Sequence, residues 1–286
     1  MIGLGFRQHG GSEQLTDVTI DEPSPRAGEV RVRLEAAAFN RLDGFVLQGI
    51  PGVPIDLPHV VGSDGAGRVD QLGEGVDDLR IGDPVLLNPG MWDGTCPACR
   101  AGRESLCRNY RILGEHTQGT ATAYTTVPRR NVHPRPEHLT PGEAASMPLV
   151  FQTAYRALTT IGELQAGDRL AVIGAGGGVA TAVLQIGRMI GAQVAVVSRS
   201  PAKAERAVSL GADAGLVITD DRPLDAVLWE WSGKQGIDVI FDSVGAPTLP
   251  RSVRALARGG RVVVIGATAG PKVEVDVRPL FWRQTS

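Results

Sequence analysis

The segment from Arg169 to Lys203 constrains the fold of this chain more than any other. It contains two apolar runs, Leu170–Ile173 and Val194–Val197, and four glycines lie between Gly174 and Gly178 just after the first run. Glycine allows a tight turn and a close backbone approach to a pyrophosphate, and a helix N-terminus offers free N–H groups to that anion. A strand, a glycine turn, a helix and a second strand in this order predict a dinucleotide site. The residues expected to contact the dinucleotide here are Ala175, Gly176, Gly177, Gly178 and Val179.

The end of the second run indicates which dinucleotide is bound. An NAD site usually has an acidic residue there that accepts hydrogen bonds from the ribose 2′-OH. This chain has Ser198, followed by Arg199 and, one helical turn later, Lys203. A guanidinium beside a hydroxyl suits a 2′-phosphate, so the sequence favours NADP(H) over NAD(H). The alternative is that both basic residues are solvated charges at the start of a helix.

Composition excludes several classes of partner. The chain has 286 residues, enough for one large or two ordinary domains, and a formal net charge of −2. Without a long basic run or a long apolar stretch, neither a nucleic-acid nor a membrane partner is expected. The chain has three cysteines, an odd number that fits a reduced compartment and a metal better than disulfides. We therefore expect a cytoplasmic protein that acts on a small molecule.

The two halves of the chain have different patterns. Residues 1–135 show short strands separated by Gly and Pro, which predicts a small barrel or sandwich. Residues 136–286 alternate helix and strand, which predicts a parallel sheet with helices on both faces. Ligands of such sheets bind beyond the carboxyl ends of the strands, here near Val244, Gly266 and Ala267 as well as the glycine turn. The helix expected after that turn carries the apolar residues Val179, Val183, Leu184, Ile186 and Met189.

The three cysteines fall in one loop, residues 88–108, with the spacing Cys96-x2-Cys99-x7-Cys107. Thiolates two residues apart can both face one tetrahedral ion, and a third arrives after a short loop. Asp93, three residues before Cys96, is a candidate fourth ligand, because a carboxylate oxygen also binds zinc. Four protein ligands leave no open position, so the loop predicts one structural zinc ion. The alternative is three free thiols.

These motifs resemble the medium-chain dehydrogenase/reductase superfamily of zinc alcohol dehydrogenases and quinone reductases. The resemblance rests on Gly62–Gly67, Cys96 to Cys107, Ala175–Ala180 and Asp242–Gly245, and it covers nearly the whole chain. It implies a GroES-like β-barrel domain over residues 1–135, followed by a Rossmann doubly wound parallel sheet over residues 136–286.

The resemblance also shows where this chain departs from the zinc-dependent members. Their catalytic zinc is held at positions that match Asn40, Ser63 and, by a rough alignment, Leu149. An amide, a hydroxyl and an aliphatic side chain cannot hold a labile zinc ion. We therefore expect no catalytic zinc, while Asp93 stands where the structural lobe of the family has its first cysteine.

The pair Asn40 and Asp43 resembles the quinone oxidoreductase and the acryloyl- and crotonyl-CoA reductase branches. That resemblance implies hydride transfer from NADPH to a quinone or to an activated C=C bond of an enone or enoyl thioester, with Asn40 and Asp43 as catalytic residues. Asn40 would hydrogen-bond the substrate carbonyl or the nicotinamide ribose, although it could instead be a loop-capping amide. The alternatives are a zinc-type alcohol dehydrogenase and a cofactor-binding protein without turnover.

The resemblance further implies a sixth strand and a return segment beyond the position that matches Ser286. We therefore interpret the chain as a fragment of a longer protein or as a truncated product. Relatives commonly dimerise through the sixth strand, so a homodimer is expected for the full length and is doubtful for this chain. Without that strand, the sheet is expected to end in an exposed edge.

Overall fold

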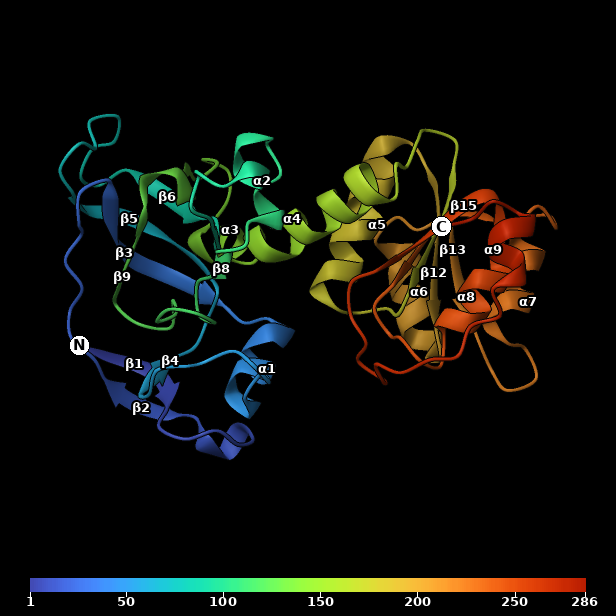
Figure 1. Cartoon of the computed structure of the whole chain (residues 1–286), viewed down its shortest axis with the longest axis horizontal. Coiled ribbons are helices and arrows are strands. Elements are labelled where there is room, and N and C mark those ends of the chain that lie inside the picture. Colours follow the sequence, from blue (N-terminus) through green and yellow to red (C-terminus); the bar gives the residue numbers. More distant parts are fainter. The chain divides into compact units, whose positions relative to one another are not determined.

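The computed structural model describes all 286 residues, which form two compact units, Met1–Leu149 and Val150–Ser286 (Figure 1). The division falls later than the expected boundary after residue 135. Helix α3 (Pro141–Ala145) accounts for the difference, since its buried Ala144 and Ala145 pack with Ala66 in the core of the first unit.

The first unit is built on antiparallel sheets. A five-stranded sheet has the order β10-β6-β5-β3-β9, and a three-stranded sheet has the order β2-β1-β4. Valine and leucine side chains such as Val32, Val69 and Leu87 are buried beside the larger sheet. This half-barrel confirms the GroES-like prediction. The strands are β1 (Ile2–Phe6), β2 (Thr16–Thr19), β3 (Glu29–Ala38), β4 (His59–Val60), β5 (Asp64–Leu72), β6 (Pro84–Leu87), β9 (Tyr124–Pro128) and β10 (Val132–Pro134).

Short helices and one small sheet complete this unit. Helix α1 follows β3. The loop of residues 88–108 contains β7 and two short helical turns, and β7 pairs with β8, which follows the loop. The bounds are α1 (Arg41–Gln48), β7 (Gly90–Met91), α2 (Pro97–Arg100), β8 (Arg111–Ile112), and the 3-10 turns η1 (Ser12–Gln14), η2 (Glu104–Leu106) and η3 (Arg129–Asn131).

The second unit contains a five-stranded parallel sheet of order β13-β12-β11-β14-β15. This order and the intervening helices confirm the Rossmann prediction. The strands are β11 (Arg169–Ile173), β12 (Gln193–Ser198), β13 (Ala214–Val217), β14 (Ile237–Asp242) and β15 (Leu256–Val264). The helices are α4 (Pro148–Arg156), whose first residues belong to the first unit, the π-turn η4 (Ala157–Ile161), α5 (Gly178–Ile190), α6 (Pro201–Ser209), α7 (Leu224–Trp231), α8 (Leu249–Ala255) and α9 (Arg278–Trp282).

Helix α5 lies close to the sheet because it has a glycine where the two meet. A Cβ atom on Gly187 would lie 2.6 Å from Leu170 Cδ2 and 3.2 Å from Val194 Cγ2. Val183, Leu184 and Ile186 of this helix are buried, whereas Met189, in its last turn, is 74% exposed.

Substitution of Gly187 by valine should destabilise the protein by about 2–3 kcal/mol, since the added side chain overpacks a site beside Leu170, which is fully buried. Urea unfolding followed by circular dichroism measures the change. Gly44→Val is the matched control, because Gly44 is also in a helix but has no atom within 4 Å of its Cβ position. Equal losses in both variants would show that helix propensity, and not helix–strand packing, decides the cost.

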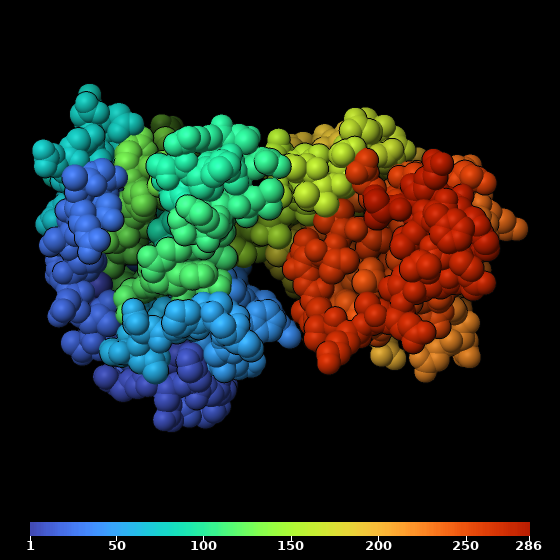
Figure 2. Space-filling view, in the orientation of Figure 1, coloured from blue at the N-terminus to red at the C-terminus, as the bar shows by residue number.

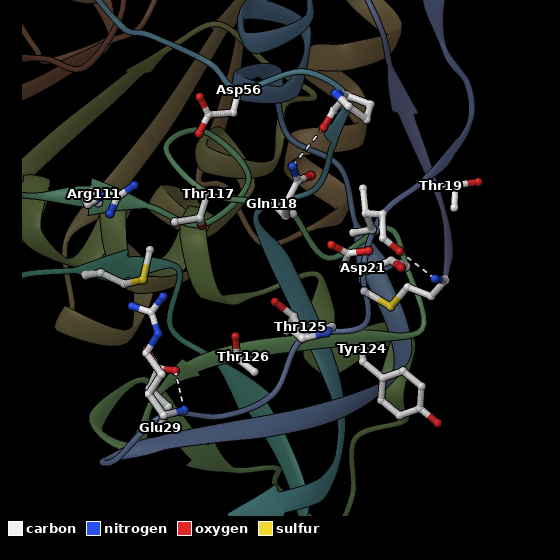
Figure 3. Close-up of a pocket in the computed structure, with 18 of the residues that line it drawn as sticks. Thr19, Asp21, Glu29, Asp56, Arg111, Thr117, Gln118, Tyr124, Thr125 and Thr126 are labelled. Carbon is white, nitrogen blue, oxygen red and sulfur yellow. Dashed lines mark hydrogen bonds between the residues drawn. The ribbon is translucent and has the colours of Figure 1, made fainter. Parts of the chain in front are cut away.

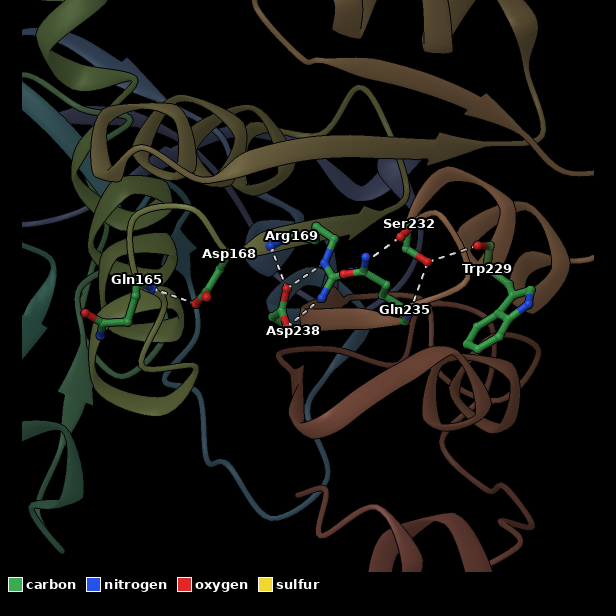
Figure 4. A network of polar contacts seen from close by, with 8 residues as sticks. Gln165, Asp168, Arg169, Trp229, Ser232, Gln235 and Asp238 are labelled. Atoms are coloured by element: carbon green, nitrogen blue, oxygen red, sulfur yellow. Dashed lines mark hydrogen bonds and ion pairs between the residues drawn. The ribbon is translucent and has the colours of Figure 1, made fainter.

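A polar network joins the starts of β11 and β14 (Figure 4). Arg169 Nε donates to Asp238 Oδ2 at 2.8 Å, and its Nη2 donates to Asp238 Oδ1 at 3.1 Å. The backbone N–H of Arg169 donates to the same carboxylate at 2.9 Å. This fork lies at the amino ends of the strands, and the opposite ends remain available for a ligand.

The sequence predicts that the sheet ends in an exposed edge, but the outer edge of β15 is partly covered. Both backbone groups of Ser286 bond to this edge. The Val262 N–H donates to Ser286 O at 2.8 Å, and the Ser286 N–H donates to Gly260 O at 3.1 Å. Gly259 N–H likewise donates to Arg283 O at 2.8 Å. The last residues therefore cover part of this edge. Figure 2 colours this end of the chain dark red. The residues before them, 272–277, form no strand or helix.

Candidate functional site

A cavity of about 690 Å³ opens at the carboxyl ends of the parallel strands in the second unit. This is where a doubly wound sheet binds its ligand. Its lining includes five cofactor-binding residues predicted from the sequence and one residue next to them. The five are Ala175, Ser198, Arg199, Lys203 and Val244, and the sixth is Gly174.

The glycine turn has the backbone that a pyrophosphate site requires. Gly174 and Gly176 have φ of +96° and +89°, in the left-handed region that side chains disfavour. Gly177 caps helix α5, and no atom lies within 4 Å of its Cβ position. A Cβ on Gly176 would fill the space 3.6 Å from the Lys203 side chain. The N–H groups of the first turn of α5 have no partner within the helix, so they can donate to an anion. These residues fit a dinucleotide phosphate.

The residues at the end of β12 lie together around the same cavity. Ser198 is buried, and its Oγ accepts the Ser200 N–H at 3.0 Å. The Arg199 side chain is 80% exposed and lies 3.8 Å from Asp220, which is fully exposed. An ion pair this open to water is weak, so Arg199 is free to bind another anion.

Two charged residues of this cavity were missed by the sequence reasoning. Asp220 follows β13, and Arg251 lies in α8, where its Nη1 donates to Asp225 at 2.8 Å. Both lie beyond the carboxyl ends of strands, and that position was the only signal that could have identified them. With Arg199 and Lys203, they give the cavity more positive than negative charge.

The turn after β14 brings Val244 to the loop that contains Gly266 and Ala267. The buried Asp242 carboxylate accepts the N–H groups of Val244 and Gly245, at 2.8 and 3.2 Å, and the hydroxyls of Thr248 and Ser252. Gly245 has φ of +92°, and its Cβ would lie 2.9 Å from Ala267 Cα. The Asp-Ser-Val-Gly motif thus fixes this turn, and the turn packs against the 266–270 loop.

In the first unit, Asn40 and Leu149 converge on one carboxylate. Asn40 Nδ2 donates to Asp64 Oδ2 at 2.8 Å, and the Leu149 backbone N–H donates to Asp64 Oδ1 at 2.9 Å. Asp64 is almost completely buried, and this burial raises its pKa to about 7. The sequence reasoning named Asp64 only as part of a motif. Its place directly after Ser63 was the signal that it adjoins the site.

Ser63 lies between these groups in the sequence and is fully buried, and its Oγ has no hydrogen-bond partner in the chain. A neutral hydroxyl, an amide nitrogen engaged with a carboxylate and an aliphatic side chain do not form a zinc site. The three positions that match the catalytic zinc ligands of the family therefore do not fit that metal.

Asp43 faces the backbone around it. Its Oδ2 accepts the Asn40 N–H at 2.6 Å, and its Oδ1 accepts the Gly62 N–H at 2.7 Å. Burial raises the pKa of Asp43, and these two N–H bonds oppose that rise. The carboxylate thereby connects the start of α1 to the turn before Ser63, and it holds Asn40 in place from the backbone side.

The predicted metal ligands come together in the loop of residues 88–108. One ligand atom from each of Asp93, Cys96, Cys99 and Cys107 lies within 4.8 Å of the others. The Cys96 and Cys99 sulfurs are 3.4 Å apart. A tetrahedral ion with Zn–S bonds of about 2.3 Å requires sulfurs at about 3.8 Å, so small shifts would suffice. Three thiols and a carboxylate could hold one zinc ion with no open position.

Asp93 is oriented by its neighbours. Its Oδ1 accepts the N–H groups of Thr95 and Cys96 at 2.8 and 2.9 Å, and its Oδ2 accepts Asn109 Nδ2 at 2.8 Å. The backbone N–H groups, chiefly that of Cys96, hold the pKa of Asp93 well below its usual range. The carboxylate is thus ionised, as a metal ligand must be.

Another cavity, of about 850 Å³, lies elsewhere in the first unit (Figure 3). Its lining includes Thr117, Gln118, Thr125, Asp56 and Arg111, and none of the predicted site residues. Its size alone does not make it the active site, because the residues that carry the predicted chemistry lie elsewhere. No helix of the structure has both the length and the apolar character needed to span a bilayer.

Comparison with known proteins agrees with this arrangement. Residues 26–137 match the alcohol dehydrogenase GroES-like domain, and residues 178–286 match the zinc-binding dehydrogenase family. The chain is 28% identical over 280 residues to a 2-dehydro-3-deoxy-L-galactonate 5-dehydrogenase of Pseudoalteromonas atlantica, covering 97% of this chain and 80% of that protein. It is 32% identical over 248 residues to an acryloyl-coenzyme A reductase of Metallosphaera sedula, covering 86% and 71%.

A solved structure described as an NAD-dependent alcohol dehydrogenase has a TM-score of 0.93 and 39% identity, covering all of this chain and 83% of that one. The half-barrel, the Rossmann sheet and the glycine turn define a nicotinamide-dependent oxidoreductase. The chain belongs to the medium-chain dehydrogenase/reductase superfamily.

Proposed function

We propose that this oxidoreductase transfers hydride from NADPH to an activated C=C bond or a quinone without a catalytic zinc ion. The observation that carries the proposal is the site around Asp64, where Asn40 and Leu149 donate to one buried carboxylate and the Ser63 hydroxyl has no partner, so that the three residues matched by resemblance to zinc ligands do not offer a metal site. A C=C bond conjugated to a carbonyl needs no metal, because hydrogen-bond donors can stabilise the charge that develops on the carbonyl oxygen. Among the relatives are an acryloyl-coenzyme A reductase and a crotonyl-CoA carboxylase/reductase.

Each group of residues in the site would have a distinct role. When bound, the reduced nicotinamide supplies the hydride. Arg199 and Lys203 bind the 2′-phosphate, and the glycine turn with the N-terminus of α5 binds the pyrophosphate. The Val244 turn and the backbone at Gly266 and Ala267 orient the cofactor. Asn40 donates a hydrogen bond to the substrate carbonyl, and Asp43 keeps Asn40 at the start of α1.

Turnover by zinc-replete protein tests the proposal, with NADPH absorbance followed against crotonyl-CoA, a quinone and an aldehyde. We expect NADPH to be oxidised with crotonyl-CoA or with the quinone. The active protein should contain no more than one zinc ion per chain. Asn40→Ala should lower kcat/KM by about a hundredfold, the usual cost of losing one oxyanion donor. Gln48→Ala, at the other end of α1, is the control and should leave the rate unchanged.

A zinc-type alcohol dehydrogenase is the second candidate, favoured by the solved structure at 39% identity and by an NAD-dependent alcohol dehydrogenase of Sulfurisphaera tokodaii at 31% identity. Alcohol oxidation that requires a second zinc ion per chain would establish this candidate. It would also overturn the metal-free reductase.

A further inference from the structure

Asn109 contacts two of the four candidate metal ligands. Its side-chain Nδ2 donates to Asp93 Oδ2 at 2.8 Å, and its backbone N–H donates to Cys107 Sγ at 3.4 Å. Because only an N–H can donate to a carboxylate, the amide has a defined orientation, with Nδ2 towards Asp93. Asn109 is exposed and follows shortly after Cys107, so it joins the last ligand of the loop to the first.

The two oxygens of Asp93 differ in the number of N–H groups that they accept. Oδ1 accepts the N–H groups of Thr95 and Cys96, at 2.8 and 2.9 Å. A carboxylate oxygen has about two lone-pair sites, so both sites of Oδ1 are used. Oδ2 accepts the Asn109 N–H and keeps its other site. Oδ2 is therefore the oxygen that can bind a metal ion.

The main chain around Asp93 is held by a different residue. Arg130 Nη2 donates to the Trp92 carbonyl oxygen, and the guanidinium carbon of Arg130 lies 5.1 Å from the centre of the Trp92 ring. On the other side of Asp93, a Cβ atom on Gly94 would lie 2.8 Å from Arg130 Nη1. Loss of the Asn109 side chain leaves these contacts and the two bonds to Oδ1 in place, so it releases Oδ2 without releasing the loop.

We propose that Asn109 is a positioning residue for the metal centre and restricts Asp93 to binding through Oδ2 alone. A carboxylate can bind a metal ion through one oxygen or through both, and only the first mode gives a four-coordinate site with three thiolates. Such a site leaves no position for water or for a substrate. Asn109 thus keeps the centre closed, as a structural role requires.

The charge of the ligand set supports the same role. Three thiolates and one carboxylate carry more negative charge than one divalent ion neutralises. N–H donors around such ligands disperse the excess charge and hold each ligand in orientation, and the affinity for the metal depends on them. Asn109 supplies one donor to a sulfur and one to an oxygen, although it is not a ligand itself.

The first test measures zinc affinity of the full chain, kept reduced, by competition with a chromophoric chelator. Asn109→Ala should raise the Kd for zinc by about tenfold to a hundredfold, the usual cost of losing an outer hydrogen bond to a metal ligand. Ser105→Ala is the matched control, because Ser105 is also exposed and uncharged and lies in the same loop. A natural chain that binds no zinc, or an Asn109→Ala chain with the natural Kd, would overturn the proposal.

The second test measures coordination number with cobalt(II) in place of zinc. Cobalt absorbs visible light strongly in a tetrahedral site and weakly when further ligands join, so its spectrum reports the geometry. The natural chain and Ser105→Ala should give the strong spectrum. Asn109→Ala should give a weaker one, because a water molecule or the second Asp93 oxygen can then join the ion. The same strong spectrum in all three chains would contradict the positioning role.

A double-mutant cycle separates a role through Asp93 from general support of the loop. In an Asp93→Cys chain the fourth ligand is a sulfur, and the carboxylate that Asn109 holds is gone. Adding Asn109→Ala to this chain should therefore change the zinc Kd by less than about threefold, since the two residues are coupled. An equal loss of affinity in both backgrounds would show that Asn109 does not act through the carboxylate. None of these measurements depends on which substrate the protein reduces.

Discussion

Replacement of Arg199 by alanine should raise the dissociation constant for NADPH by about tenfold to a hundredfold and leave that for NADH nearly unchanged. The guanidinium is exposed, and its only ionic partner is the distant carboxylate of Asp220. A charge-assisted hydrogen bond to a phosphate contributes about 1.5–3 kcal/mol, and NADH has no 2′-phosphate to receive it. Fluorescence titration with each cofactor measures both constants.

Two further variants make this test specific. Asp220→Asn should tighten NADPH binding a few-fold, because the carboxylate competes with the phosphate for Arg199. Arg222→Ala is the control, since Arg222 lies on the same unit but pairs with Glu230 at 2.8 Å, away from the cavity. If Arg199→Ala weakens both cofactors equally, Arg199 does not read the 2′-phosphate, and the preference for NADP(H) must be abandoned.

Substitution of Cys99 by serine should abolish zinc binding and lower the melting temperature by about 10 °C. A metal present at a thousandfold excess over its Kd stabilises the folded state by about 4 kcal/mol, and each kcal/mol is worth about 2–4 °C in a protein of this size. Elemental analysis and thermal unfolding, with and without a chelator, measure the two effects.

The variant Asp93→Cys is the matched comparison, because it keeps four ligands at the same four positions. It should retain zinc more strongly than the natural chain, since a thiolate is a softer ligand than a carboxylate. A natural chain that binds no zinc, together with a Cys99→Ser variant of unchanged stability, would show that the cluster consists of free thiols.

The Rossmann unit could be predicted closely from the sequence because local patterns specify it. Apolar runs of strand length alternate with helical patterns, and glycines mark the turn at Gly174, so the runs Leu170–Ile173 and Val194–Val197 fall within β11 and β12. The partial covering of the β15 edge by Ser286 and Arg283 was not predicted from the sequence. Exposure depends on where a helix or strand ends relative to its neighbours, which no local pattern contains.

The two candidate sites differ in the same way. The cysteine cluster was predictable, since Cys96, Cys99 and Cys107 are close in sequence and a short loop can bring them together. The predicted cofactor residues of the glycine turn follow β11, and Ser198 and Arg199 lie at the end of β12. Because these two strands are adjacent and parallel, both groups of residues lie at the same edge of the sheet. Asp220 and Arg251 reach that edge from other elements, so they became visible only in the folded chain.

The sequence by itself determined the fold class and the glycine turn, because each depends on residue type and short spacing. Only the tertiary structure decided that Asp64 joins Asn40 to Leu149, which lie 24 and 85 residues from it along the chain. The physical reason is that a buried carboxylate must find N–H donors, and β-sheet packing brings these donors together from distant segments.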